Sequence, residues 1–234
     1  MALFTWWRGD SLPTLPELEG FHAAASDDAH LLAQLAGLEL EEARRRLAGH
    51  HRAYVASLGA TPVAYGWVAL EGADIGELDV QFTLPAGDRY LWDFKTLPAW
   101  RGRGIYPRLL QAILRAEARH AERFWIIHAP ENGASQAGIE KAGFRVAGEL
   151  SFRRNEGAGL LPGELPARAR TGAALLGVPL VDEVMILTAQ EEPLAPCWHC
   201  VINARESGAG DSAVECWPEA PALAASQPCT CGCG

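Results

Sequence analysis

The feature that most constrains the fold is an arginine- and glycine-rich junction between a predicted strand and a predicted helix. Residues 89–97 (RYLWDFKTL) are typical of a strand, and Pro98 ends it because proline cannot donate to a sheet ladder. Apolar residues then recur at helical spacing from Ile105 to about residue 120. The connection alternates arginine with glycine: Arg101, Gly102, Arg103 and Gly104. Because the apolar strand RFWIIHA (123–129) follows, the segment predicts a central β-α-β crossover.

The start of that helix has the chemistry of an anion-binding site. A helix N-terminus leaves its first amides unpaired and carries about half a positive charge, and glycine lets those amides approach an oxygen closely. Two common phosphate motifs are absent, because no Gly-Lys-Ser/Thr is present and the dinucleotide pattern would need glycine at Pro107. The loop therefore predicts a pyrophosphate cradle of another kind. A turn whose arginines are only solvated is the alternative.

The remaining periodicity predicts an α/β chain of the α+β type, with a mixed, mostly antiparallel sheet and flanking helices. Further helices are expected between Asp28 and Gly37, from Leu40 to Leu47, and from about Ser135 to Lys141. Further strands are expected at residues 51–58, 62–70, 78–84, 144–152 and 181–188. The first two of these strands form a predicted hairpin.

Two segments show no clear period: the proline-broken lead before Ser26, and residues 155–180. The lead carries two aromatic residues expected to be exposed, Trp6 and Trp7. Both segments are candidates to shape an acceptor pocket, and their alternative role is to cover a sheet edge.

The junction resembles the central signature of the GNAT superfamily of acyl-CoA-dependent N-acyltransferases, Arg/Gln-x-x-Gly-x-Gly/Ala. Arg101 and Gly104 are in register, whereas Tyr106 replaces the last Gly or Ala. A second match lies in ENGASQAGIEKAGFR (131–145), where Ile139 stands at a position that is commonly tyrosine. The residues that match there are Asn132, Ser135, Lys141, Gly143 and Phe144. The resemblance spans about residues 20–188 and implies a single GNAT-like domain at 1–189.

The resemblance implies acetyl-CoA as cosubstrate. The strands that end at Thr96 and Ala129 would splay apart, the pantetheine arm would pair with main chain near Lys95 and Thr96, and Asn132 would contact the arm from the other side. The pyrophosphate would lie on the amides of the cradle. The implied cofactor-binding residues are Lys95, Thr96, Arg101, Gly102, Arg103, Gly104, Ile105, Tyr106, Asn132 and Ser135.

The implied reaction is direct transfer of an acetyl or other acyl group to a primary amine, with an amide near Thr96 as oxyanion donor. Asp93 is one candidate base, because Trp92 and Phe94 flank it; its alternative is an ion pair with Lys95 or a loop arginine. His128 is the other, because it ends the facing strand and histidine is a common acid–base residue. Glu131 and a water relay are further options.

The usual tyrosine acid is missing because Ile139 cannot protonate a leaving thiolate. A thiol of pKa about 8.5 leaves tolerably without such an acid. Tyr106 is a substitute donor or a residue that packs on the next turn of its helix.

The net charge of −9 argues against nucleic acid as partner, because phosphate binding needs clustered Lys and Arg. The sequence carries neither a secretory signal nor an apolar run of the roughly 20 residues that a membrane span needs, so a cytoplasmic protein without membrane contact is expected. A homodimer is compatible with this composition. The acceptor amine is not named by any motif, although the mildly acidic body favours a cationic small molecule.

Residues 190–234 differ from the rest, because they hold all six cysteines, from Cys197 to Cys233. Their composition, rich in Ala, Pro, Gly and Ser, predicts an acidic and flexible tail. One C-x-x-C, Cys197 and Cys200, with a distant cysteine cluster is compatible with zinc. Two alternatives to catalysis therefore stay open: an acyl-CoA sensor on the same fold, and a metal-binding protein acting through these cysteines. No metal ligand is predicted within 1–189.

Overall fold

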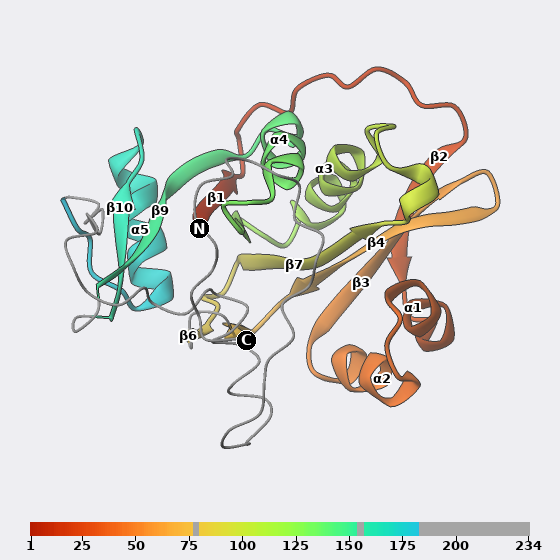
Figure 1. Ribbon diagram of the computed structural model, residues 1–234, viewed down its shortest axis with the longest axis horizontal. Coiled ribbons are helices and arrows are strands. Elements are labelled where there is room, and N and C mark those ends of the chain that lie inside the picture. Colours follow the sequence, from red (N-terminus) through yellow and green to blue (C-terminus); the bar gives the residue numbers. More distant parts are fainter. Residues whose placement is uncertain (77–79, 154–156, 183–234) are drawn as a thin grey trace, which may run out of the picture. The chain divides into compact units, whose positions relative to one another are not determined.

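A mixed sheet of eight strands organises the chain, which a computed structural model describes over residues 1–76, 80–153 and 157–182 (Figure 1). The strand order is β10-β9-β1-β8-β7-β4-β3-β2. The strands are β1 (Ala2–Trp7), β2 (Phe21–Ser26), β3 (His51–Leu58), β4 (Thr61–Ala69), β7 (Asp88–Thr96), β8 (Arg123–His128), β9 (Arg145–Arg153) and β10 (Gly157–Pro162). Each neighbouring pair is antiparallel except β7 and β8, which are parallel. The predicted fold class is confirmed.

Helices cover both faces of this sheet. The helices are α1 (Ala29–Ala36), α2 (Leu40–Ala48), α3 (Ile105–Glu117), α4 (Gly133–Ala142) and α5 (Pro166–Leu176). Leu109 and Ile113 of α3 pack with Leu91 and Ile126 on one face, in a cluster that Ile139 of α4 completes. Helices α1 and α2 pack on the other face, against alternate residues of β3 and β4. Figure 1 shows α3 and α4 on the side of the sheet opposite α1 and α2.

Helix α1 begins and ends at the residues that the sequence indicated, whereas α4 begins two residues before the predicted Ser135. The Asp28 carboxylate accepts a hydrogen bond from the Leu31 amide at 3.0 Å, and Gly37 ends α1 in the left-handed conformation at φ 75°. The Asn132 side chain caps α4 by accepting from the Ser135 amide, and Gly143 ends that helix at φ 102°. Residues 98–100 form a single 3₁₀ turn before the cradle.

Strand β1 is the largest departure from the predicted elements. The proline-broken lead was expected to carry no strand, yet β1 lies between β8 and β9 and pairs with both. Its residues Leu3, Phe4 and Trp6 are buried, so the expectation that Trp6 is exposed is wrong. The strand has buried residues on both faces and therefore shows no alternation that a sequence pattern could reveal.

Residues 155–180 were also expected to be irregular, but they contain β10 and α5. Helix α5 packs closely on the sheet because Ala169, Gly172 and Ala173 lie on its buried face, together with Leu175 and Leu176. A Cβ on Gly172 would lie 2.6 Å from Leu3 Cδ2, so only glycine allows this approach. Alanine and glycine give a weak hydrophobic period, and this explains why the helix was missed.

A small hairpin of β5 (Gly72–Ile75) and β6 (Val80–Thr83) stands apart from the main sheet. The expected strand at 181–188 is described only at its first two residues, where the Val181 amide donates to the Leu160 carbonyl at 3.0 Å. Its other residues and the cysteine tail lie outside the described residues. Within the described ranges, no helix has both the length and the hydropathy needed to cross a bilayer.

Candidate active site

The site is centred on a seam where two neighbouring strands part. The parallel pairing of β7 with β8 runs only from Asp88, opposite Arg123, to Leu91, opposite Ile126. Residues 92–96 of β7 continue along β4 but have no partner on the β8 side. The backbone groups on that side are available to a ligand that lies along the strand, as the resemblance implied.

A bulge in β7 determines on which face of the sheet the side chains of Asp93 and Phe94 lie. The register with β4 shifts opposite Gly66, and Asp93 adopts a left-handed φ of 48°. A Cβ on Gly66 would lie 2.0 Å from the Phe94 ring, so the ring rests against bare backbone. Phe94 therefore faces α3, and Asp93 faces α2.

A cavity of about 520 Å³ opens beside the seam, between β7, the cradle and α4. Its lining residues are Phe94, Lys95, Thr96, Trp100, Arg101, Gly102, Gly104, Ile105, Tyr106, Pro107, Asn132, Ala134, Ser135, Ala137, Gly138 and Lys141. The structure thus brings together all the predicted cofactor-binding residues except Arg103. Sequence reasoning missed the aromatic walls, Phe94 and Trp100, because their neighbours depend on the fold.

The cradle is held open and is positively charged. Gly104 precedes α3 at φ 69°, and Arg108 fixes it by donating to its carbonyl at 2.6 Å and to the Pro16 carbonyl. Among the described residues, no backbone carbonyl accepts from the amides of residues 103–106. Arg101 donates to the Thr96 carbonyl at 3.2 Å, and the Arg103 guanidinium lies 4.7 Å from the Trp100 ring centre. Free amides between two arginines fit an extended anion such as a pyrophosphate.

Tyr106 bridges two walls of the cavity. Its ring centre lies 5.5 Å from that of Phe94, and its hydroxyl lies 3.4 Å from Ser135 Oγ. Gly138 makes room for it, since a Cβ there would lie 2.4 Å from the ring. Burial raises the pKa of Tyr106 to about 12, so its phenol is neutral at physiological pH. Ile139 is fully buried and supplies no polar group.

Asp93 lies in an ion pair, outside the cavity lining. Arg46 of α2 donates to one carboxylate oxygen at 2.5 Å, and the Tyr65 hydroxyl donates to the other at 3.2 Å. Arg46 also donates to Glu42 at 2.8 Å and lies 4.6 Å from the Trp92 ring centre. The alternative of an ion pair is therefore observed, with a helix arginine as partner in place of Lys95 or a loop arginine.

His128 lies at the end of β8 and is only 6% exposed. Its Nδ1 is 2.8 Å from the Ala129 carbonyl, and its ring centre is 5.3 Å from that of Phe4. Nε2 is buried and has no hydrogen-bond partner among the described residues. His128 does not line the cavity at the seam, although it ends the strand that forms the seam's other side.

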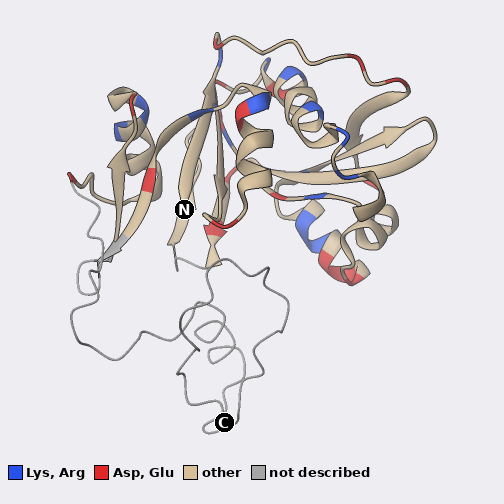
Figure 2. Cartoon of the chain, turned by 45° about the horizontal axis from the view of Figure 1, so that its top comes forward, with Lys and Arg blue, Asp and Glu red and all other residues tan. Residues whose placement is uncertain are grey.

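Basic and acidic residues are interleaved on the described elements in the view of Figure 2. Helix α2 is typical, because its arginines pair with acidic residues of the same helix: Arg44 with Glu41, and Arg45 and Arg46 with Glu42.

A mixed sheet with a parted parallel pair, and a helix whose free amides face that seam, form the arrangement that the resemblance implied. Residues 16–144 match the family model described as "Acetyltransferase (GNAT) family", so the chain belongs to the GNAT acetyltransferase family, whose members use acyl-CoA. The matched stretch begins after β1. No curated protein matches the sequence.

Several solved structures share the fold at low identity. A GCN5-related N-acetyltransferase from Kribbella flavida is 18% identical, with 62% of this chain and 53% of that chain covered and a TM-score of 0.44. The aminoglycoside acetyltransferase AAC(6')-Iy, bound to a bisubstrate analog, is 19% identical, covering 58% and 97%, with a TM-score of 0.45. AAC(6')-Ih from Acinetobacter baumannii is 19% identical, covering 59% and 100%, with a TM-score of 0.43. The chain spans about half the length of the Kribbella structure.

Proposed function

We propose that this protein is an N-acetyltransferase that moves an acetyl or related acyl group from acyl-CoA directly to a primary amine. The observation that carries the proposal is the cavity at the seam. It combines strand backbone at residues 92–96 that is not paired with β8 in the described residues, free amides at the start of α3, and the positive side chains of Arg101 and Lys141. The Thr96 carbonyl accepts from Arg101.

The ligand's parts match the parts of this cavity. The amide groups of a pantetheine arm pair with main chain near Lys95 and Thr96, as an added strand would. The pyrophosphate lies on the amides of residues 103–106, where Arg101 and Arg103 add charge. Asn132 and Ser135 lie beside the arm on the α4 side. The Asn132 side chain also caps α4 by accepting from the Ser135 amide.

In the transfer, the amine nitrogen bonds to the thioester carbon, an amide near Thr96 stabilises the oxyanion, and the C–S bond then breaks. The thiolate leaves without a protein acid, because a thiol of pKa about 8.5 is a tolerable leaving group. The base takes the amine's proton, which reaches the sulfur through solvent. Asp93 and His128 stay our candidate bases. Asp93 is supported by its place beside the seam, and His128 by its unpartnered Nε2.

The test of this function is turnover of acetyl-CoA with a panel of amines, followed by trapping of the free thiol and mass detection of the product. We expect thiol release that depends on the amine, and heat on calorimetric titration with acetyl-CoA. Arg101→Ala should weaken acetyl-CoA binding about tenfold, because it removes a charged contact. Arg119→Ala is the matched control, because Arg119 is exposed and lies outside the cavity.

The acyl-CoA sensor remains the second candidate, favoured by the buried Ile139 and by candidate bases that lie outside the lining. Tight binding of acetyl-CoA without thiol release for any amine would support the sensor over the enzyme. Absence of binding would reject both.

A further inference from the structure

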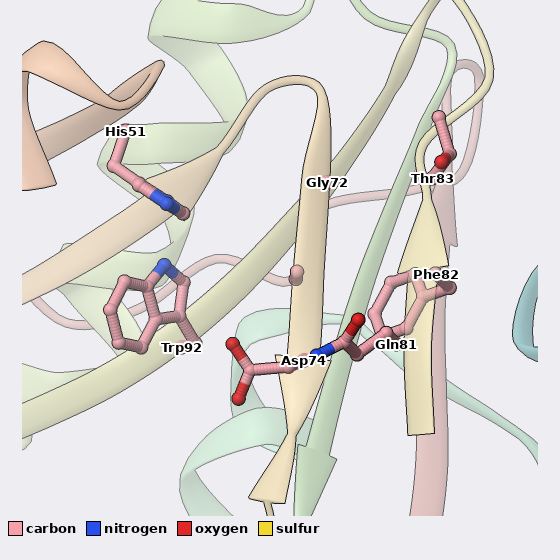
Figure 3. A pocket seen from close by; sticks show the side chains of 8 residues that line it. His51, Gly72, Asp74, Gln81, Phe82, Thr83 and Trp92 are labelled. Atoms are coloured by element: carbon pink, nitrogen blue, oxygen red, sulfur yellow. The ribbon is translucent and has the colours of Figure 1, made fainter. Parts of the chain in front are cut away.

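A second cavity, of about 420 Å³, lies between the β5–β6 hairpin and β7 (Figure 3). Its lining residues are His51, Gly72, Ala73, Asp74, Gln81, Phe82, Thr83 and Trp92. In the hairpin register Gly72 pairs with Thr83 and Asp74 pairs with Gln81, so these four residues share one face. The opposite face packs Ile75 and Phe82 into the core. The hairpin thus presents its polar face to an aromatic wall, at a size typical of small-molecule sites.

The charge of this cavity is negative. Asp74, which is exposed, is the carboxylate among the described residues of the lining, and these include no lysine or arginine. Burial lowers the pKa of His51, and the nearby Arg46 lowers it further, while Asp74 only partly opposes this; the imidazole is therefore neutral at physiological pH. The charge of Arg46 is itself neutralised by Glu42 and Asp93. The lining therefore favours a cation.

Two buried polar atoms beside the cavity have no hydrogen-bond partner among the described residues. They are His51 Nδ1 and Trp92 Nε1, from rings whose centres are 5.1 Å apart. Figure 3 shows both rings on one side of the cavity, opposite the hairpin. Buried polar groups are normally paired. His51 Nδ1 can accept from an ammonium group when Nε2 carries the proton, whereas Trp92 Nε1 only donates and needs an acceptor.

The cavity lies next to the seam, on the other side of the sheet from the proposed acyl-CoA cavity. Trp92 is the first residue of β7 beyond the last pair with β8, and it packs with the cluster on the α1 and α2 face. Phe94, two residues later, lines the acyl-CoA cavity on the α3 face. At about 3.3 Å per residue, these two side chains leave the strand within roughly 7 Å of each other. Beyond Leu91, β7 has no pairing with β8 among the described residues, so no ladder of backbone hydrogen bonds joins the two strands over this stretch.

We propose that the β5–β6 cavity is the acceptor site and that it selects a small diamine or polyamine, with one ammonium group paired to Asp74. The assignment rests on the proposed function. A nitrogen must be uncharged to attack a thioester, so the nitrogen held by Asp74 is not the one acylated. The second amine extends to the seam, where its nitrogen bonds to the acyl carbon, the C–S bond breaks, and the proton it loses ends on the CoA thiol.

The test compares 1,4-diaminobutane and spermidine with 1-aminobutane, which lacks the second charge. With wild-type protein and saturating acetyl-CoA, we expect kcat/KM to be about tenfold higher or more for the diamine, because a charged contact is gained. Asp74→Asn should remove this preference by raising KM for the diamine, and KM for acetyl-CoA should not change. Gln81→Ala serves as a second variant of the same face. Glu71→Gln is the matched control, because that carboxylate is exposed like that of Asp74 but lies outside the lining and pairs with His50.

Calorimetry with 1,4-diaminobutane in the absence of acetyl-CoA separates this inference from the proposed function. If titration with 1,4-diaminobutane gives heat that Asp74→Asn abolishes, and no thiol is released in the activity assay, the acceptor site is supported and the proposed acetyltransferase activity is contradicted. Thiol release with equal KM for the diamine in Asp74→Asn and wild type would overturn the cavity and leave the enzyme standing. If titration of the wild-type protein with 1,4-diaminobutane gives no heat, the proposed acceptor site is also overturned.

Discussion

At the scale of single residues, Tyr106 shows how one substitution in a motif is accommodated by another position. The family signature has glycine or alanine there, whereas this chain places a ring beside the cradle. The Tyr106 ring fits because Gly138 of α4 has no Cβ. It also fits because the Phe94 ring lies against Gly66, which leaves the Phe94 ring able to contact Tyr106. The three sites are therefore coupled through packing, and a change at one is expected to alter the others.

Two variants separate the packing of Tyr106 from its hydroxyl. Tyr106→Phe keeps the ring against Phe94 and Gly138, so we expect acetyl-CoA affinity and kcat to stay within about threefold of wild type. Tyr106→Ala removes the ring and should cost about 3 kcal/mol of unfolding free energy and weaken acetyl-CoA binding. Chemical denaturation and calorimetric titration measure these effects. A loss of kcat in Tyr106→Phe as large as that in Tyr106→Ala would instead assign the hydroxyl a part in proton transfer.

At the scale of elements, helix α3 is fixed at both ends by buried or half-buried charges. Arg108 ties its first turn to the cradle and to the loop before β2. Glu117, fully buried in its last turn, accepts hydrogen bonds from Arg52 and Tyr54 of β3 and from Arg89 of β7. The cradle is therefore positioned by contacts at both ends of the helix that follows it.

Glu117 gives this arrangement a pH dependence. Burial would raise the pKa of Glu117, but the hydrogen bonds from Tyr54 and Arg52 outweigh it and hold that pKa below the ordinary value of 4.5. A depressed pKa contributes stability that is present above the unfolded value and is lost as the pH falls through the folded value. Glu117→Gln should cost about 3 kcal/mol at neutral pH and reduce the loss of stability below pH about 4.5.

Denaturation curves at pH 7 and at pH 4 measure both effects. Glu41→Gln is the control, since Glu41 is exposed and pairs only with Arg44 of the same helix among the described residues. Equal losses in the two variants would show that the buried network is not what stabilises α3.

At the scale of the whole molecule, the N-terminal strand β1 lies outside the family match and yet forms part of the main sheet. Residues 16–144 match the family, but β1 comes before them and lies between β8 and β9. Leu3 and Phe4 of this strand are fully buried and join two core clusters. Helix α5 then packs on Leu3 from residues after the match. Both flanks of the matched stretch therefore contribute to one core.

Among the described residues, the buried clusters come from positions 3–176, and we predict that residues 1–189 suffice for folding. A protein that ends at Ala189 should unfold at the same denaturant concentration as the full chain and bind acetyl-CoA equally well. Metal analysis of both proteins tests the cysteine hypothesis, since zinc held by Cys197–Cys233 would be lost on truncation. A truncated protein that no longer binds acetyl-CoA would show that the tail belongs to the site.

Some features of the site could be predicted because they depend on neighbours in the chain. The cradle, its helix and the caps at Asp28 and Asn132 follow from residue spacing and backbone geometry. The partner of Asp93 could not be predicted, because Arg46 lies on another helix and reaches it only after β3, β4 and β7 have paired. The cavity under the hairpin was missed for the same reason.

The sequence by itself indicated the helices and strands that have a clear hydrophobic period, and it indicated the family through two spaced motifs. It did not indicate β1, β2, β5, β10 or α5. Only the tertiary structure decided that residues 2–7 enter the centre of the sheet, that Asp93 faces α2, and that Tyr106 packs across α4. The physical reason is the distance along the sequence over which each kind of interaction acts. Periodicity and capping act over one or two turns of chain, whereas strand pairing, bulges and ring packing join residues far apart in sequence and are fixed only when the whole core forms.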